Sequence, residues 1–210
     1  MNDKYMELMH IPYKEAYLAY KIWDSQEVPY AERQPLLMHL SSHQPVLIHM
    51  LNTMTKGPVL EVGVGNHSTP IMHLICANQN RKLLSVETDE RWYLSYRQLK
   101  SKWHDVDHVT EEKLINGDYP FFKNKFALAF IDGTRLSRQP MIERLANKVD
   151  YLIVHDTEEI VAKRKYDETS YNYDFSMFKN VFHFKCMYPC TSVLTNLNSI
   201  NLQVYEFFNR

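Results

Sequence analysis

The sequence predicts a single α/β domain built on a mostly parallel sheet with helices on both faces. Short apolar runs recur along the chain, and most are followed by a segment whose apolar residues have helical spacing. Strands that alternate with helices pair in parallel through right-handed crossovers. Strands that are apolar throughout suit a sheet that is covered on both faces. The length of 210 residues fits one such domain.

Residues 1–56 are expected to form helices that pack on the α/β domain of residues 57–210. An apolar helix face is indicated near the end of this segment, where Ser42 is the expected N-cap and Pro45 lies in the first turn. The apolar residues of this face are Val46, Leu47, Met50, Leu51 and Met54.

Five apolar runs are expected to form parallel strands, and the chain after them an antiparallel hairpin. The expected strands are residues 59–62, 83–86, 109–115, 126–131 and 151–154, and the hairpin pairs 181–188 with 191–196 around Pro189. Helices are expected to begin at Ser68 or Thr69, at Asp89 and near Pro140.

Composition and charge exclude several classes of partner. The net charge is −1 and no basic block is present, which disfavours nucleic acid and anionic membranes. The longest purely apolar run, residues 126–131, is far shorter than a membrane span, and no leader-like apolar segment opens the chain. We therefore expect a cytoplasmic protein with no nucleic-acid partner and no membrane partner.

Acids and glycines gather at the ends of the expected strands. The sequence has only five glycines, and each lies at the boundary of a predicted strand. Ligands of open parallel sheets bind beyond the carboxyl ends of the strands. Because buried acids without a partner are costly, the pattern indicates a polar ligand that carries positive charge. The strand ends are Glu61 to Gly65, Glu87, Gly117-Asp118, Asp132-Gly133 and His155-Asp156.

In this order, the motifs of residues 57–196 resemble those of the class I S-adenosylmethionine-dependent methyltransferases. The segment Glu61-Val62-Gly63-Val64-Gly65 matches the acidic-x-Gly-x-Gly loop of that family. Glu87 matches the acid that holds the ribose hydroxyls, and Asp118 the acid that faces the adenine amino group. The resemblance implies a Rossmann-like, seven-stranded sheet with a reversed C-terminal hairpin strand. It also implies S-adenosylmethionine as cofactor, bound by Glu61, Gly63, Gly65, Ser68, Glu87 and Asp118.

Two other functions remain open on the sequence. An NAD(P)-binding oxidoreductase of Rossmann type would need a third glycine, where Ser68 stands. Its pyrophosphate would also be repelled by Glu61. A catalytically inactive binding module of the methyltransferase fold would keep the same motifs without turnover.

The expected reaction is methyl transfer to a small-molecule acceptor at oxygen, which must lose its proton to a base or to a metal. The candidate catalytic residues are Asp132, His155 and Asp156. Asp132 and Asp156 resemble the metal-binding strand ends of the metal-dependent O-methyltransferases and could hold Mg²⁺ or another divalent ion. His155 stands where an acid is more usual and would favour manganese, iron or zinc. The alternative is that Asp132 touches the donor or acceptor directly while His155 is the base.

Two further patterns allow a functional or a structural interpretation. His39 with His43, and His104 with His108, could chelate zinc on a helix, although solvated helix faces are favoured. The polar, tyrosine-rich residues 157–177 could cover an acceptor pocket or could pack as a loop on the sheet.

Overall fold

The computed structural model confirms the predicted α/β fold. It describes residues 42–54, 56–157, 160, 171, 173–185, 189–201 and 204. A seven-stranded sheet has the order β3-β2-β1-β4-β5-β7-β6. The first five strands are parallel, and β7 runs antiparallel to both β5 and β6. The strands are β1 (Val59–Val62), β2 (Leu83–Glu87), β3 (His104–His108), β4 (Phe126–Ile131), β5 (Val149–His155), β6 (Asn180–Phe184) and β7 (Thr191–Thr195).

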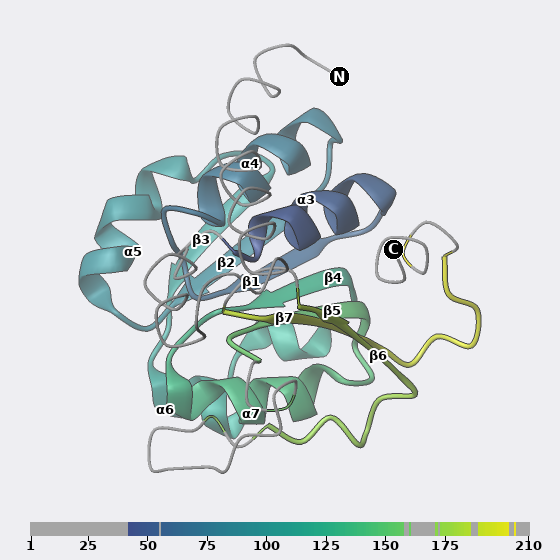
Figure 1. Ribbon diagram of the computed structural model, residues 1–210. Coiled ribbons are helices and arrows are strands. Elements are labelled where there is room, and N and C mark those ends of the chain that lie inside the picture. The colour runs from purple at the N-terminus through teal and green to yellow at the C-terminus, as the bar shows by residue number, and fades with distance from the viewer. Residues whose placement is uncertain are drawn as a thin grey trace, which may run out of the picture.

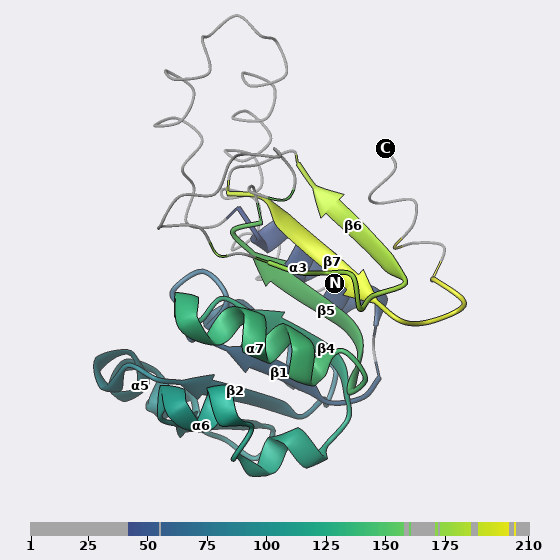
Figure 2. The same ribbon diagram turned by 90° about the horizontal axis from the view of Figure 1, so that it is seen from below.

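Helices cover both faces of the sheet. In Figure 1, α3 and α4 lie on one face and α6 and α7 on the other, and Figure 2 shows α6 and α7 from below. The α-helices are α3 (Gln44–Thr53), α4 (Thr69–Asn78), α5 (Glu90–Tyr96), α6 (Glu111–Asn116) and α7 (Arg135–Leu145). Short 3-10 helices follow α5 at Arg97–Leu99 (η1) and precede β4 at Pro120–Lys123 (η2).

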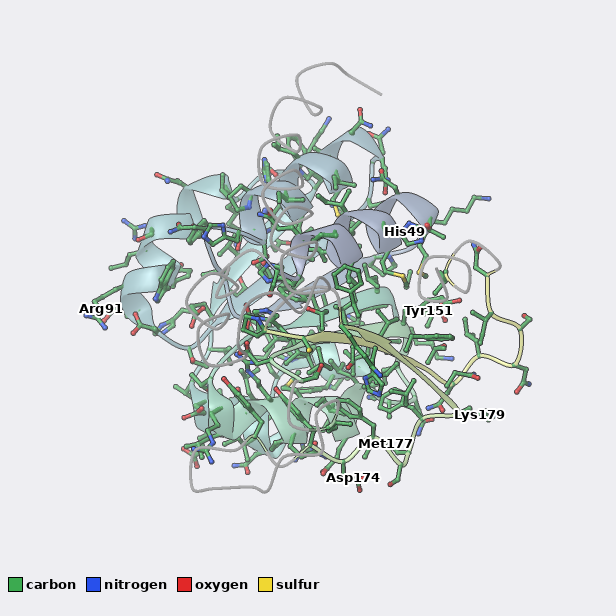
Figure 3. All side chains as sticks on the ribbon, in the orientation of Figure 1. His49, Arg91, Tyr151, Asp174, Met177 and Lys179 are labelled. Atoms are coloured by element: carbon green, nitrogen blue, oxygen red, sulfur yellow. The ribbon has the colours of Figure 1, made fainter. Side chains whose placement is uncertain are left out.

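Two apolar layers form the core, because successive residues of each buried strand point to opposite faces. In β4, Ala129 and Ile131 pack in the layer of α6 and α7, while Leu128 and Phe130 pack in the layer of α3 and α4. Exposed and buried side chains can be compared in Figure 3. Arg91 projects from the outside of α5, whereas the buried Tyr151 lies against the sheet.

The third strand differs from the prediction. Residues 109–115 were expected to form it, but β3 comes earlier and α6 occupies most of that range. The Thr110 hydroxyl accepts a hydrogen bond from the backbone N–H of Lys113 and caps the helix. Gly117, in the left-handed region at φ 75°, ends it. The apolar residues of this range are therefore one face of a helix.

Helix positions agree in part with the sequence. Asp89 caps α5 as expected, accepting hydrogen bonds from the N–H groups of Arg91 and Trp92. Helix α7 begins at Arg135, earlier than predicted, with Pro140 inside it. Helix α3 confirms the apolar face predicted near residue 46, while residues 1–41 lie outside the described residues. Within the described ranges, no helix has the length and apolarity that crossing a membrane requires.

Gly63 is expected to be indispensable to this fold, because it brings the β1 and β4 ends together. Its φ is +92°, and a Cβ there would lie 2.6 Å from backbone atoms of Asp132 and Gly133. Gly63→Ala should lower the free energy of unfolding by roughly 2–5 kcal/mol, measured by urea denaturation. Gly65→Ala is the control, since its Cβ would meet only Ser68 Oγ at 3.6 Å. Equal losses in both variants would contradict this explanation.

Candidate functional site

A pocket of about 480 Å³ lies at the carboxyl ends of β1, β2 and β4. Of the nine site residues that the sequence predicts, four line it: Gly65, Ser68, Glu87 and Asp132. The full lining is His43, Val64, Gly65, Asn66, His67, Ser68, Glu87, Asp89, Trp92, Asp132, Gly133 and Thr134.

The loop after β1 is held from inside the protein. The N–H of Gly65 donates to Thr69 Oγ1 over 2.9 Å, and the Thr69 hydroxyl donates to Glu61 Oε1 over 3.0 Å. The Ser85 hydroxyl donates to the other Glu61 oxygen over 2.5 Å. Glu61 is fully buried and does not line the pocket, so it positions the glycine loop through Thr69. Its predicted contact with a cofactor stays a prediction.

Burial also changes the acidity of Glu61. It raises the pKa of this carboxyl to about 7, although the hydrogen bonds from Ser85 and Thr69 act in the opposite direction. The carboxyl therefore titrates near neutral pH, although it does not line the pocket.

Glu87 joins the loops after β1 and β2 at the pocket wall. Its Oε2 accepts the N–H of Val64 over 2.8 Å, and its Oε1 accepts the N–H groups of Thr88 and Asp89 over 2.6 and 2.7 Å. Each carboxylate oxygen accepts about two hydrogen bonds, so Oε2 keeps one position for a ligand hydroxyl. Asp89 adds a second carboxylate to this wall.

Two more predicted cofactor residues do not line the pocket, whereas Ser68 does. Gly63 and Asp118 do not line the pocket, and Asp118 is exposed after the C-terminal end of α6. Ser68 is the N-cap residue of α4, as expected, but its side chain makes no capping hydrogen bond. The Ser68 side chain instead hydrogen-bonds the buried Glu61 carboxyl. Ligand contacts for Ser68 and Asp118 both stay predictions.

A buried arginine joins the two strand-end aspartates. Arg138 Nη2 donates to Asp132 Oδ1, and Arg138 Nη1 donates to Asp156 Oδ2, each over 2.8 Å. Nη1 also reaches the carbonyl of His155 at 3.1 Å, and Nε that of Gly133 at 2.8 Å. Asp156 adopts a φ of 57°, in the left-handed region, directly after β5. The cation between the two carboxylates is therefore a guanidinium of the protein itself.

His155 lies beside both carboxylates. Its Nδ1 is 3.2 Å from Asp132 Oδ1 and 3.4 Å from Asp156 Oδ1, while its Nε2 is 2.9 Å from Ser42 Oγ. Burial lowers the pKa of His155, but the hydrogen bond and charge of Asp132, with the charge of Asp156, outweigh it and raise that pKa. Ser42 was expected to cap α3. Its hydroxyl instead donates to Pro189 O over 2.8 Å, and the N-cap is His43.

Within the tyrosine-rich segment 157–177, the two described tyrosines, Tyr171 and Tyr173, pack on this cluster. The Tyr171 hydroxyl donates to Asp156 Oδ2 over 3.1 Å, and the Arg138 guanidinium lies 4.5 Å from the Tyr171 ring centre. The Tyr173 hydroxyl donates to the His155 carbonyl over 3.1 Å. Neither tyrosine lines the pocket, which favours the packed interpretation for these residues. Most of residues 158–170 lie outside the described part.

His43 is a site residue that the sequence pattern misassigned. It is buried, lines the pocket, and its ring centre is 4.7 Å from that of His155. Among the described residues, neither ring nitrogen has a partner at hydrogen-bond distance and angle, although the His67 backbone is near enough to influence the pKa of the ring. Burial, with the nearby His155, lowers the pKa of His43 to about 3. His39 lies outside the described residues. His104 and His108 belong to β3 and His104 is buried, so neither the helical zinc pair nor the favoured solvated helix face is correct for them.

Arg138 and Ser42 had no local sequence signal. Arg138 lies six residues beyond the Asp132 that it contacts, in a helix of unremarkable polarity, and Ser42 is 113 residues from His155. Only the recurrence of acids at strand ends indicated that a cation was needed there.

Comparison with known proteins supports the fold. No protein-family model matches the chain, and no curated protein matches it. Cofactor-bound Rv0187 from MTB superposes with a TM-score of 0.57 at 16% identity, over 89% of this chain and 91% of that one. The O-methyltransferase TomG from Streptomyces achromogenes, in complex with SAM, gives 0.55 at 14% identity, over 87% of each chain.

The O-methyltransferase from Bacillus cereus, in complex with SAH, gives a TM-score of 0.55 at 11% identity, over 87% of this chain and 90% of that one. At such identities the likeness is one of fold. The chain therefore has the Rossmann-like fold of these methyltransferases, as the sequence predicts.

Removal of Arg138 should leave two carboxylates without their buried counter-charge. We expect Arg138→Met to lower the free energy of unfolding by roughly 3–5 kcal/mol at neutral pH. The loss should shrink as the pH falls and Asp132 becomes protonated. Arg135→Met, in the exposed part of the same helix, should change stability by less than about 0.5 kcal/mol. Urea denaturation at several pH values measures both, and equal effects would refute the role of Arg138.

Glu61 should make stability depend on pH. Because its folded pKa of about 7 exceeds that of an unfolded glutamate, its contribution is largest below the unfolded pKa. That contribution falls as pH rises to about 7, by on the order of 3 kcal/mol. Glu61→Gln should remove this dependence. The free energy of unfolding of the variant should therefore rise relative to that of the wild type as pH rises. Glu90→Gln, at an exposed position, is the control. Parallel pH profiles for wild type and Glu61→Gln would disprove the expectation.

Proposed function

We propose that this chain is an S-adenosylmethionine-dependent methyltransferase that methylates a small-molecule acceptor at oxygen. The observation that carries the proposal is the position of Glu87 and Asp132 on opposite sides of the glycine loop, in a pocket beyond the carboxyl ends of β1, β2 and β4. Solved structures of this fold that have SAM or SAH bound support the same conclusion.

The residues of the pocket fit this cofactor. Its volume is within the range of cofactor sites, about 300–1,000 Å³. Three carboxylates line it, and the described lining contains no lysine or arginine. Negative walls suit a ligand with sulfonium and ammonium charges and disfavour the pyrophosphate of a dinucleotide. Glu87 Oε2 would receive a ribose hydroxyl, and the loop of Gly65 and Ser68 would contact the amino-acid part.

The cofactor would supply an electrophilic methyl group, and the protein would hold the acceptor in line with it. Of the three predicted catalytic residues, Asp132 alone lines the pocket. Burial raises the pKa of Asp132, but the hydrogen bond from His155 and the charges of His155 and Arg138 outweigh it and lower that pKa. Asp132 would therefore orient the acceptor hydroxyl as an ionised hydrogen-bond acceptor. His155 and Asp156 would act through Asp132 and Arg138.

The remaining predictions about function belong to this proposal. The alternatives are an NAD(P)-dependent oxidoreductase and an inactive module of the same fold. Ligand binding distinguishes the oxidoreductase from a methyltransferase. The cytoplasmic location and the absence of nucleic-acid and membrane partners stay predictions from composition.

Binding of S-adenosylhomocysteine is the direct test, by calorimetry and by the fluorescence of Trp92, which lines the pocket. We expect saturable binding, and none of NAD, NADP or ATP. Glu87→Ala should weaken it roughly 10- to 100-fold, because charge-assisted hydrogen bonds are lost. Glu87→Gln loses the charge but keeps an oxygen that can accept a hydrogen bond from the loop N–H groups. Comparing it with Glu87→Ala therefore distinguishes loss of the charge from loss of the hydrogen bonds to the loops. Glu90→Ala, outside the pocket, is the control.

Preference for a dinucleotide would overturn the proposal in favour of an oxidoreductase. Formation of S-adenosylhomocysteine from S-adenosylmethionine with a panel of hydroxylated small molecules then separates an enzyme from an inactive module.

A further inference from the structure

The hydrogen bonds of Ser42 fix the tautomer of His155. The single proton of the Ser42 hydroxyl is donated to the Pro189 carbonyl, so Ser42 Oγ can only accept from His155 Nε2. A neutral His155 therefore carries its proton on Nε2 and its lone pair on Nδ1.

That lone pair faces negative charge. Nδ1 lies 3.2 Å from Asp132 Oδ1 and 3.4 Å from Asp156 Oδ1. A lone pair cannot be stable between two carboxylate oxygens unless a cation lies among them. The cluster also keeps a net negative charge, because Arg138 balances one of its two aspartates. The position beside Nδ1 therefore requires a proton or a metal ion.

His43 indicates which cation it is. A proton shared between His155 and Asp132 would leave both nitrogens of the buried His43 ring without a well-formed hydrogen bond, which is their state among the described residues. Such orphaned groups are rare in folded proteins. One ring nitrogen of His43, one oxygen of Asp132 and one nitrogen of His155 lie within 4.8 Å of one another. Ligands on opposite sides of a metal are about 4.2 Å apart, so a modest closure would bring all three to one ion.

The neighbours of these ligands resemble the surroundings of a metal site. Metal-bound histidines usually donate their other N–H to an oxygen, as His155 does to Ser42. Asp132 Oδ2 has no hydrogen-bond partner in the described part of the chain, whereas Oδ1 is held by Arg138. Asp156, which the sequence predicted as a ligand, is instead paired with Arg138 and Tyr171.

We propose that His43, Asp132 and His155 form a three-ligand site for a divalent transition metal, open toward the pocket. Two imidazoles and one carboxylate favour zinc, manganese, iron or cobalt over Mg²⁺, which prefers oxygen ligands. His43 and Asp132 line the pocket, so a free coordination position would face a bound molecule. In its chemical role the site rests on the proposed function, because it would bind the oxygen of a methyl acceptor.

Cobalt binding tests the site without any need for activity. The full, untagged chain is treated with EDTA, desalted and titrated with Co²⁺, while the visible d–d absorption is recorded. We expect one equivalent to bind, Zn²⁺ to displace it, and excess Mg²⁺ to leave it in place. His43→Gln should weaken Co²⁺ binding at least tenfold. His73→Gln is the matched control, because His73 and His104 form a separate imidazole pair with Nδ1 atoms 2.9 Å apart.

Zinc X-ray absorption of the wild type keeps the proposal falsifiable if His43→Gln fails to fold. Two imidazole nitrogens around the ion would support it. Fewer than two, no stoichiometric Co²⁺ binding, or unchanged binding in His43→Gln would overturn it. Calorimetry with S-adenosylhomocysteine in EDTA tests the proposed function separately: binding there without a metal site would refute only this inference, and a metal site without cofactor binding would refute only the function.

Discussion

The geometry of the site depends on one buried guanidinium. Arg138 reaches the ends of β4 and β5 at once, through Asp132, Asp156 and the carbonyls of Gly133 and His155. Its planar fork allows these bonds in one arrangement only, so the two strand ends cannot move independently. Because a buried charge must be compensated, loss of Arg138 would leave both carboxylates without their counter-charge. The left-handed backbone at Asp156 is the local conformational cost of turning its carboxylate toward Arg138.

The acids at the ends of β1 and β2 act first on the protein's own backbone. Glu61 holds Gly65 through Thr69, and Glu87 gathers N–H groups from the loops after β1 and β2. A carboxylate that already receives several hydrogen bonds loses little freedom when a ligand adds one more. The acidic motif therefore prepares a rigid rim, and a single open acceptor position on Glu87 remains for recognition.

Sequence patterns predicted most of the sheet because buried strands are continuously apolar, as β4 is. They failed for β3, an edge strand whose residues are His104, Asp105, Val106, Asp107 and His108. An edge strand is covered less completely and can carry polar side chains, so the apolar face of α6 was taken for it. The glycine loop, Glu87 and Asp132 were predicted because each lies at the end of a strand. His43 and Arg138 could not be, since each becomes part of the site only through contacts between separate elements.

The two halves of the site differ in how far apart their residues lie in the sequence. The half of the pocket around the glycine loop comes from one segment, from Val64 to Trp92, and a local motif describes it. The opposite half joins the start of α3 to the ends of β4 and β5: Ser42 and His43, neighbours in sequence, both contact His155. The register of α3 therefore decides which groups meet Asp132. A substitution at the start of α3 would therefore change the surroundings of Asp132 without changing the glycine-loop motif.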